Sequence, residues 1–232
     1  IQPTLESVGK LFTNQIIPGA ESKSIDDFFE RVSKAGGLLR IDENIKPTMY
    51  RCSTVTKSEL KELRRIKNVI RKGRVKIIND KEILLDGGSI PTSLGTLHID
   101  CAGDGLAKRP PKKIFSSRKI TLQSVRTCQQ VFSAALLGFV EASFEEDEKK
   151  NELCKPVPHP NSDIDFLRNT IADALNQESW INEPILSRWL EESRLNPQSH
   201  ILKGSLTFKI LSTINKIPFI QLSNSALKAQ AR

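Results

Sequence analysis

The sequence is poor in the residues that usually build metal and redox centres. Its 232 residues include three histidines, one methionine and four cysteines. The cysteines, Cys52, Cys101, Cys128 and Cys154, form no C-x-x-C pair and have no histidine at ligand spacing. This excludes the usual zinc motifs and a disulfide framework. We therefore expect no metal site and a reducing, cytoplasmic setting.

Long apolar runs are also missing. No stretch approaches the ~20 apolar residues of a membrane span, and 38% hydrophobic with 27% charged residues is typical of a globular protein. No membrane partner is expected. The chain begins at Ile1, its one methionine is Met49, and no signal-peptide pattern is visible. We interpret it as the C-terminal portion of a longer polypeptide.

The most informative stretch that is present lies between residues 74 and 105. Alternating polar and apolar residues at 74–78, a turn at 79–81 and a second run at 82–86 predict a hairpin. The pair Gly87-Gly88 predicts another turn, and residues 96–101 predict a third, buried strand. It runs into the turn Asp100-Cys101-Ala102-Gly103-Asp104-Gly105. Small residues let a nucleotide approach the main chain there.

This pattern resembles oxidoreductases that bind FAD or NAD(P), in which a small β-meander precedes a strand ending in a triplet such as Ala-Thr-Gly. The triplet here is Cys101-Ala102-Gly103. The resemblance extends over residues 24–42, 54–73, 120–141, 149–160 and 180–195. It implies a flavin-dependent enzyme of unknown substrate, with FAD as cofactor and NAD(P) as a second candidate. The order of segments is suggestive, whereas the turn alone occurs in many proteins.

The resemblance implies that the cofactor lies against the turn, whose six residues run from Asp100 to Gly105. Asp100 and Asp104 are placed to accept from a ribose hydroxyl or a flavin group, although aspartate is also a routine turn residue. One departure matters: the glycine fingerprint G-x-G-x-x-G is absent. Half of such a cofactor site is therefore missing from these residues.

A net charge of +8 supports a rival hypothesis, because the basic residues are clustered. Residues 46–76 hold eleven of them against two acids, and residues 108–126 hold seven with no acid. In the first cluster, Thr56 and Glu59 form a capping-box pattern that predicts a helix with an apolar stripe at positions 60, 63, 66 and 70. The simplest interpretation is that its lysines and arginines form a solvated helix face.

Nucleic acid is not an expected partner. Binding to single strands requires aromatic residues among the basic ones, and the clusters contain only Tyr50 and Phe115. No helix-turn-helix, RRM or zinc-finger pattern is present. A noncatalytic phosphate- or nucleic-acid-binding interaction module remains the alternative to the flavoprotein. A third possibility is a truncated relative that folds without binding a cofactor.

The rest of the chain predicts mainly helices. A Ser24 cap predicts a helix over 25–35, followed by a short strand at 38–42. Helical spacing predicts a helix over 129–144, and the prolines at 156–160 predict an extended segment. A Ser162 cap and Pro184 predict two further helices, and we expect Trp180 and Trp189 to lie in the core. We predict an α/β fold, part of a Rossmann-like FAD/NAD(P)-binding fold with a β-meander and a helical C-terminal extension. Residues 1–127 form the dinucleotide-binding-like part, and residues 128–232 form the mainly helical region.

No side chain is assigned a catalytic role. His98, His159 and His200 lie in a predicted strand, a proline-rich loop and a helix end, where structural roles are more common. Residues 126–130 are a weaker candidate, since a guanidinium and helix-terminal amides can face one cleft there. Hydride chemistry would belong to the flavin.

Overall fold

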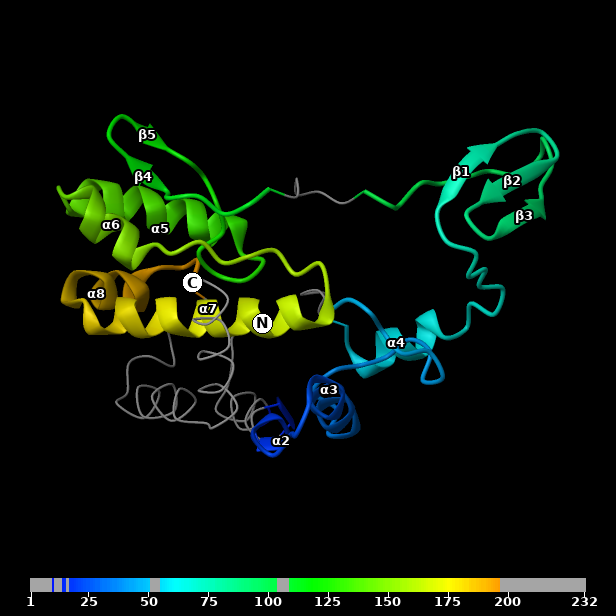
Figure 1. The fold of residues 1–232 in the computed structure, drawn as a ribbon, viewed down its shortest axis with the longest axis horizontal. Helices are drawn as coiled ribbons and strands as arrows, with labels where there is room; N and C mark the ends of the chain where they lie inside the picture. The colour runs from blue at the N-terminus through cyan, green and yellow to red at the C-terminus, as the bar shows by residue number, and fades with distance from the viewer. Residues whose placement is uncertain (1–9, 11–13, 16, 51–54, 104–108, 197–232) are drawn as a thin grey trace. The chain divides into compact units, whose positions relative to one another are not determined.

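A computed structural model describes residues 10, 14, 15, 17–50, 55–103 and 109–196. The chain divides into two compact units (Figure 1). Unit 1 comprises residues 1–55 and 110–232, and unit 2 comprises residues 56–109. This division differs from the one that the sequence suggested at residue 127, although residues 128–196 are mainly helical, as expected.

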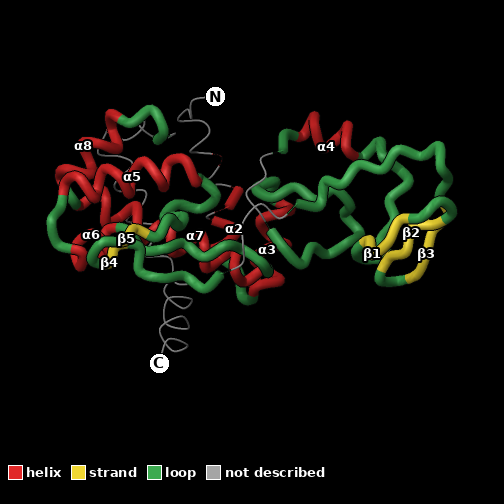
Figure 2. Tube along the Cα trace, turned by 90° about the horizontal axis from the view of Figure 1, so that it is seen from above, coloured by secondary structure: helices red, strands yellow, loops and turns green. Residues whose placement is uncertain are grey.

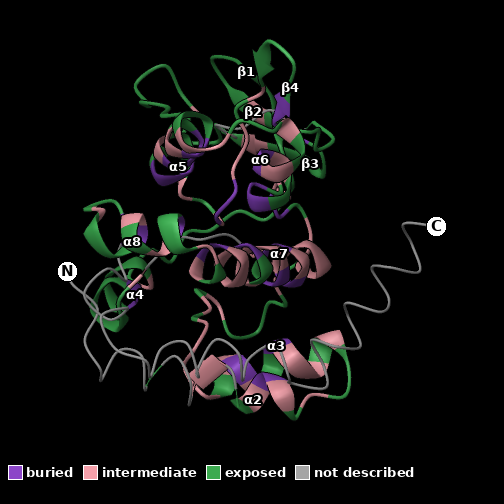
Figure 3. Ribbon diagram, turned by 90° about the vertical axis from the view of Figure 1, so that its left-hand side faces the viewer, coloured by how far each residue is buried: buried purple, intermediate pink, exposed green. Residues whose placement is uncertain are grey.

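The core of unit 1 is built on helix α5 (Gln130–Ser143). Its buried apolar side chains recur at helical spacing, as the sequence predicted, and belong to Phe132, Leu136, Leu137 and Val140. Phe132 lies in contact with Trp180, with ring centroids 5.8 Å apart. Figure 3 shows the buried residues of α5 in purple. Burial of each such side chain contributes roughly 1.5–3 kcal/mol.

A short hairpin packs beside this core. Strands β4 (Phe115–Ser116) and β5 (Lys119–Ile120) pair antiparallel and lie against α6 (Asp147–Leu153). The side chain of Asn151 on α6 accepts hydrogen bonds of 3.0 Å from the amides of Ile114 and Phe115. It also donates to the carbonyl of Phe115 at 2.7 Å. One amide side chain therefore satisfies three main-chain groups of the hairpin.

Side chains of helix α7 (Asp163–Asn182) make hydrogen bonds to the main chain around the proline segment that precedes the helix. The segment is not helical, as its prolines predicted. Three side chains on one stripe of α7 donate to carbonyls in this segment and just before it: Asn169 to Pro158, Asn176 to Lys155 and Trp180 to Leu153, at 2.9, 2.7 and 2.6 Å. These bonds supply partners to carbonyls that would otherwise be left unpaired inside the protein.

Both tryptophans anchor packing, as expected from the sequence. Trp180 is fully buried, and Trp189 on α8 (Pro184–Glu192) is half-buried and stacks on Phe139 with centroids 5.3 Å apart. Pro184 occupies the first turn of α8, where its missing amide costs no hydrogen bond. Helices α7 and α8 lie side by side (Figure 1).

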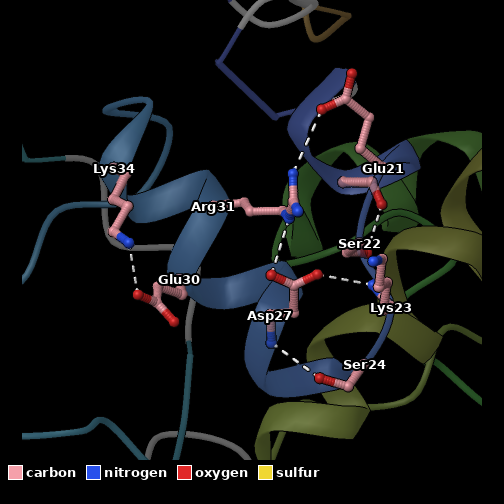
Figure 4. Close-up of polar contacts among 9 residues, drawn as sticks. Glu21, Ser22, Lys23, Ser24, Asp27, Glu30, Arg31 and Lys34 are labelled. Carbon is pink, nitrogen blue, oxygen red and sulfur yellow. Dashed lines mark hydrogen bonds and ion pairs between the residues drawn. The ribbon is translucent and has the colours of Figure 1, made fainter.

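The N-terminal part of unit 1 contains α2 (Ile17–Ala20) and α3 (Ile25–Lys34). Ser24 caps α3 by accepting from the amide of Asp27 at 3.1 Å (Figure 4). Asp27 in turn pairs with Arg31 at 2.8 Å one turn later. The pKa of Asp27 is lowered by the hydrogen bond from the Lys23 amide and by Arg31. The predicted cap and helix are confirmed.

The strand predicted at 38–42 is wrong, because the structure has bends and irregular chain there. A strand needs a neighbouring strand for its main-chain hydrogen bonds, and no pairing of this segment is found among the described residues. Beyond it, Tyr50 stacks on Phe29 of α3 with centroids 3.8 Å apart, and both contact Phe166 of α7. This aromatic cluster joins α3 to α7.

Unit 2 contains a β-meander, in which the predicted hairpin is confirmed, whereas the third strand lies at 88–91 and not at the predicted 96–101. Strands β1 (Val75–Ile78), β2 (Glu82–Leu85) and β3 (Gly88–Pro91) form an antiparallel sheet in the order β1-β2-β3 (Figure 2). The Asn79 side chain organises the first turn by accepting from the amides of Lys81 and Glu82 at 2.9 and 2.8 Å. Gly88, at φ +113°, closes the second turn in a conformation that L-residues avoid.

The helix predicted in the basic cluster is shorter than its pattern. Helix α4 spans Lys57–Leu63, and the Thr56–Glu59 capping box is present. Beyond it, the amide of Ile66 bonds to the carbonyl of Leu63 in a single turn. Of the predicted stripe, Leu60 is buried, whereas Leu63, Ile66 and Ile70 are exposed. Without an apolar surface to pack on, the stripe does not sustain a helix.

The third strand, predicted at 96–101, is also absent. The segment carries no regular structure, and Leu97 and Ile99 are 83% and 75% exposed. The predicted tail at 202–232 and His200 lie outside the described residues.

The fold is a mixture of helices and small antiparallel sheets, which agrees with the coarse α/β prediction. Parallel pairing does not occur among the strands that the structure describes. Across the described ranges, no helix is both long and apolar enough to cross a bilayer.

Candidate functional site

The predicted cofactor turn is an exposed loop in unit 2. The amide of Ala102 donates to the Asp100 carboxylate at 2.8 Å, which closes a local turn. Cys101, Ala102 and Gly103 are exposed, and a Cβ built on Gly103 would meet no atom within 4 Å. Asp104 and Gly105 lie outside the described residues. The described turn is therefore accessible to a ligand from outside this unit.

The residues that precede this turn in the sequence line an open hollow. Its volume is about 420 Å³, and it is lined by Ile83, Pro91, Thr92, Ser93, Thr96 and His98. Hydroxyl and imidazole groups face one another at its wall: Thr92 Oγ1 lies 3.2 Å from His98 Nε2, and Ser93 Oγ lies 3.1 Å from Thr96 Oγ1. The sheet supplies an apolar side and the loop a polar side.

The weaker candidate at 126–130 is arranged differently from the prediction. Arg126 is only 3% exposed, and its guanidinium donates to Asn196 at 2.9 Å and lies 4.6 Å from the centroid of the Phe132 ring. Its charge is thus directed into the protein. Cys128, Gln129 and Gln130 line a second hollow of about 390 Å³ at the start of α5. The guanidinium is used for packing in unit 1.

Sequence reasoning missed the half-buried carboxylate of Asp173, near Arg126. Asp173 accepts from Gln177 Nε2 at 2.8 Å, and its Oδ1 has no hydrogen-bond partner in the described part of the chain. Burial raises its pKa to about 6, against the opposing effects of Arg126, Gln177 and the Thr127 amide. Burial likewise lowers the pKa of Arg126. A signal was present, because Asn169, Asp173 and Asn176 share the helical spacing of Trp180.

The thiols and histidines have ordinary surroundings. Cys154 is buried, which raises its pKa to about 12, whereas Cys101 and Cys128 are exposed. His159 lies near Asn161 in the proline segment, with Nδ1 3.4 Å from Oδ1. Over the ranges that the structure describes, no three His, Cys, Asp or Glu side chains form a metal-binding group. Catalytic residues are therefore not assigned.

Comparison with known proteins gives relatives but no function. The chain is 46% identical over 199 residues to uncharacterized proteins of Mycobacterium bovis and Mycobacterium tuberculosis. The alignments cover 86% of this chain and 35% of each relative, so the chain spans about a third of the length of the curated relatives it matches. No family model matches it, and no solved structure matches it.

Proposed function

We propose that this chain is part of a flavin-dependent oxidoreductase, with FAD as cofactor and NAD(P) as a second candidate. The proposal starts from the resemblance of residues 74–105 to FAD/NAD(P)-binding proteins. The observation that supports it best is the antiparallel β1-β2-β3 meander, which precedes the small-residue turn Cys101-Ala102-Gly103 in the sequence, although residues 96–101 do not form the strand that the resemblance implies before that turn. The Rossmann-like fold that the resemblance implies belongs to the same proposal.

The accessibility of the turn supports a role in binding. Gly103 faces open space, so packing within unit 2 does not require a glycine there. A cofactor ring or pyrophosphate that approaches the main chain closely would require one. Asp100 already holds the Ala102 amide, which orders the turn before a ligand arrives. The remaining half of the site, including a glycine fingerprint, would lie in the part of a longer protein that the chain does not span.

The test is an absorbance spectrum of the longest natural form of the protein, purified without added cofactor and measured again after incubation with FAD and gel filtration. Flavin bands that elute with the protein are the expected result. Gly103→Val should then lower FAD affinity at least about tenfold, because a branched side chain blocks the approach to the turn. Gly95→Val is the matched control, since its added Cβ also meets no atom within 4 Å.

A colourless protein that retains no added FAD would overturn the proposal. Equal FAD affinities of Gly103→Val and Gly95→Val would reject the turn as the site while leaving flavin binding intact. The two results are distinguishable because the spectrum needs no variant.

A second candidate function is noncatalytic binding of a phosphate-bearing partner. Exposed basic side chains follow α4 along an irregular segment and the first strand, namely Arg65, Lys67, Arg71, Lys72, Arg74 and Lys76. Without a helix, these residues are not confined to one solvated helix face. Retention on heparin that falls steeply with salt, in a protein that binds no flavin, would favour this function over the first.

A further inference from the structure

We infer that a single buried water molecule binds inside unit 1, where it donates hydrogen bonds to two side-chain oxygens of α7, Asp173 Oδ1 and Asn176 Oδ1. The site takes a small neutral donor and links α7 to the turn at 125–127. This inference concerns the core of unit 1 and does not depend on the proposed flavin function.

The basis of the inference is a pair of buried acceptors. The side chain of Asp173 is half-buried, but its Oδ1 is shielded from solvent, as is Asn176 Oδ1. Neither oxygen accepts a hydrogen bond in the described part of the chain. Buried polar atoms are nearly always paired with a protein group or an ordered water, because leaving them unpaired costs free energy. Two such oxygens on one helix therefore indicate a bound donor.

The amide of Asn176 has a fixed orientation. Its Nδ2 donates to the main-chain carbonyls of Val125 and Lys155 at 2.8 and 2.7 Å. Carbonyl oxygens only accept, so the nitrogen must occupy this position and Oδ1 must face the other way. Asn176 is 1% exposed, and bulk solvent therefore does not supply the donor that its oxygen needs.

Neighbouring donors serve other acceptors. Ser133 Oγ accepts from the amide of Val125 at 3.1 Å and donates its one proton to the carbonyl of Gln129 at 2.8 Å. Gln177 Nε2 donates to the other carboxylate oxygen of Asp173, Oδ2. The donor for the two unpaired oxygens is thus best supplied by a bound molecule.

The spacing of the two side chains suits one water molecule. Residues three apart on a helix have Cβ atoms about 5–6 Å apart, and a water that donates to two oxygens, each about 2.8 Å away, can span that separation. Both side chains also lie against the same turn. Asn176 bonds to the Val125 carbonyl, and the Thr127 amide acts on the carboxylate of Asp173 against the rise in pKa that burial causes.

The local charges favour water over an ion. The positive charge of Arg126 acts on Asp173 and would repel a metal ion placed beside it. In the ranges that the structure describes, no three His, Cys, Asp or Glu side chains form a metal-binding group. An anion would face two acceptor oxygens. Buried waters make about three hydrogen bonds, and a guanidinium N–H of Arg126 is the natural donor to the water oxygen.

The test is a high-resolution crystal structure of the natural polypeptide that contains this chain, at about pH 8. Asp173 is then ionised, because its pKa is about 6, and cannot itself donate to Asn176. A peak that refines as water, about 2.8 Å from both oxygens, is the expected result. The inference is overturned if the position holds no peak, if a protein group donates to the two oxygens instead, or if the peak refines as a metal ion.

A variant checks the same site in solution. Water magnetic relaxation dispersion counts the long-lived internal waters of a protein. Asp173→Leu should lower this count by one, because the leucine removes an acceptor and fills the place of the water. Thr170→Leu, at an exposed position of α7, is the control and should leave the count unchanged. Equal counts in wild type and Asp173→Leu would also contradict the inference. If Asp173→Leu does not fold, the crystal structure of the wild-type protein decides.

Discussion

The indole nitrogen of Trp180 donates a 2.6 Å hydrogen bond to the main-chain carbonyl of Leu153 inside the core of unit 1. This contact joins the middle of the core to the end of α6, where the chain leaves the helix and enters the proline segment. Asn169 and Asn176 continue the same contact along α7. One stripe of a single helix therefore bonds to the chain from the end of α6 to Pro158.

Replacing Trp180 with Phe should destabilise unit 1 by about 2–4 kcal/mol. The substitution leaves the Leu153 carbonyl without its donor and opens a cavity beside Phe132. Urea unfolding followed by circular dichroism measures the change. Trp189→Phe is the comparison, with an expected loss of about 1 kcal/mol because Trp189 is half-buried. Equal losses would contradict a special role for the Trp180 hydrogen bond.

Asn151→Ala should cost about 2–4 kcal/mol, although Asn151 is only half-buried. Its side chain serves the amides of Ile114 and Phe115 and the carbonyl of Phe115, and each unpaired group carries a desolvation penalty. Asn44→Ala, at an exposed position, should change the unfolding free energy by less than about 0.5 kcal/mol. Thermal unfolding of both variants checks the prediction, which fails if the two midpoints agree.

The stability of the protein should depend on the protonation of Asp173. Its pKa is raised in the folded state to about 6 from an ordinary value of 3.8, so the folded state binds the proton more tightly. The stabilisation that this tighter proton binding gives the folded state is fully present below about pH 4 and is lost as the pH rises through 6. The free energy of unfolding of Asp173→Asn, relative to that of wild type, should therefore rise by up to about 3 kcal/mol between pH 4 and pH 7.

Urea unfolding of both proteins at pH 4, 5, 6 and 7 measures this difference. Other carboxylates, such as Asp27 with its lowered pKa, act in the opposite direction but are common to both proteins. A difference between the proteins that does not vary with pH would contradict the raised pKa of Asp173.

Gly88→Ala should weaken the β2–β3 turn by about 1–3 kcal/mol, since φ of +113° is strained for any residue with a Cβ. Gly95→Ala should have little effect, because its added Cβ meets no atom within 4 Å. Hydrogen exchange of the β2 and β3 amides is the suitable readout, because it reports on unit 2 separately. Faster exchange in Gly95→Ala than in Gly88→Ala would contradict the argument.

The elements that were predicted correctly depend on local signals. Ser24, Thr56 and Ser162 cap helices because the side-chain oxygen of each accepts a hydrogen bond from the amide three residues later. Such a cap can be predicted from neighbouring residues in the sequence. The β1–β2 turn forms because the Asn79 side chain bonds to the next amides along the chain. Such interactions span three or four residues and need no tertiary partner.

The predictions that were wrong required distant partners. Residues 38–42 and 96–101 have strand-like patterns but no neighbouring strand in the described structure, and the stripe beyond α4 has no surface to cover. Arg126 was expected to face a cleft, yet its acceptor is Asn196, 70 residues away in sequence. The cofactor turn itself stays a prediction, because a binding role cannot be read from its local geometry.

The burial of Cys154 makes this thiol a natural reporter for the opening of the core. With a pKa of about 12, it is almost entirely protonated at neutral pH and shielded from reagents, whereas Cys101 and Cys128 are exposed. Alkylation followed by peptide mass mapping would modify Cys101 and Cys128 at once and Cys154 only when α6 separates from its neighbours. The alkylation rate of Cys154 would thus measure how often the core of the native protein opens, without any introduced label.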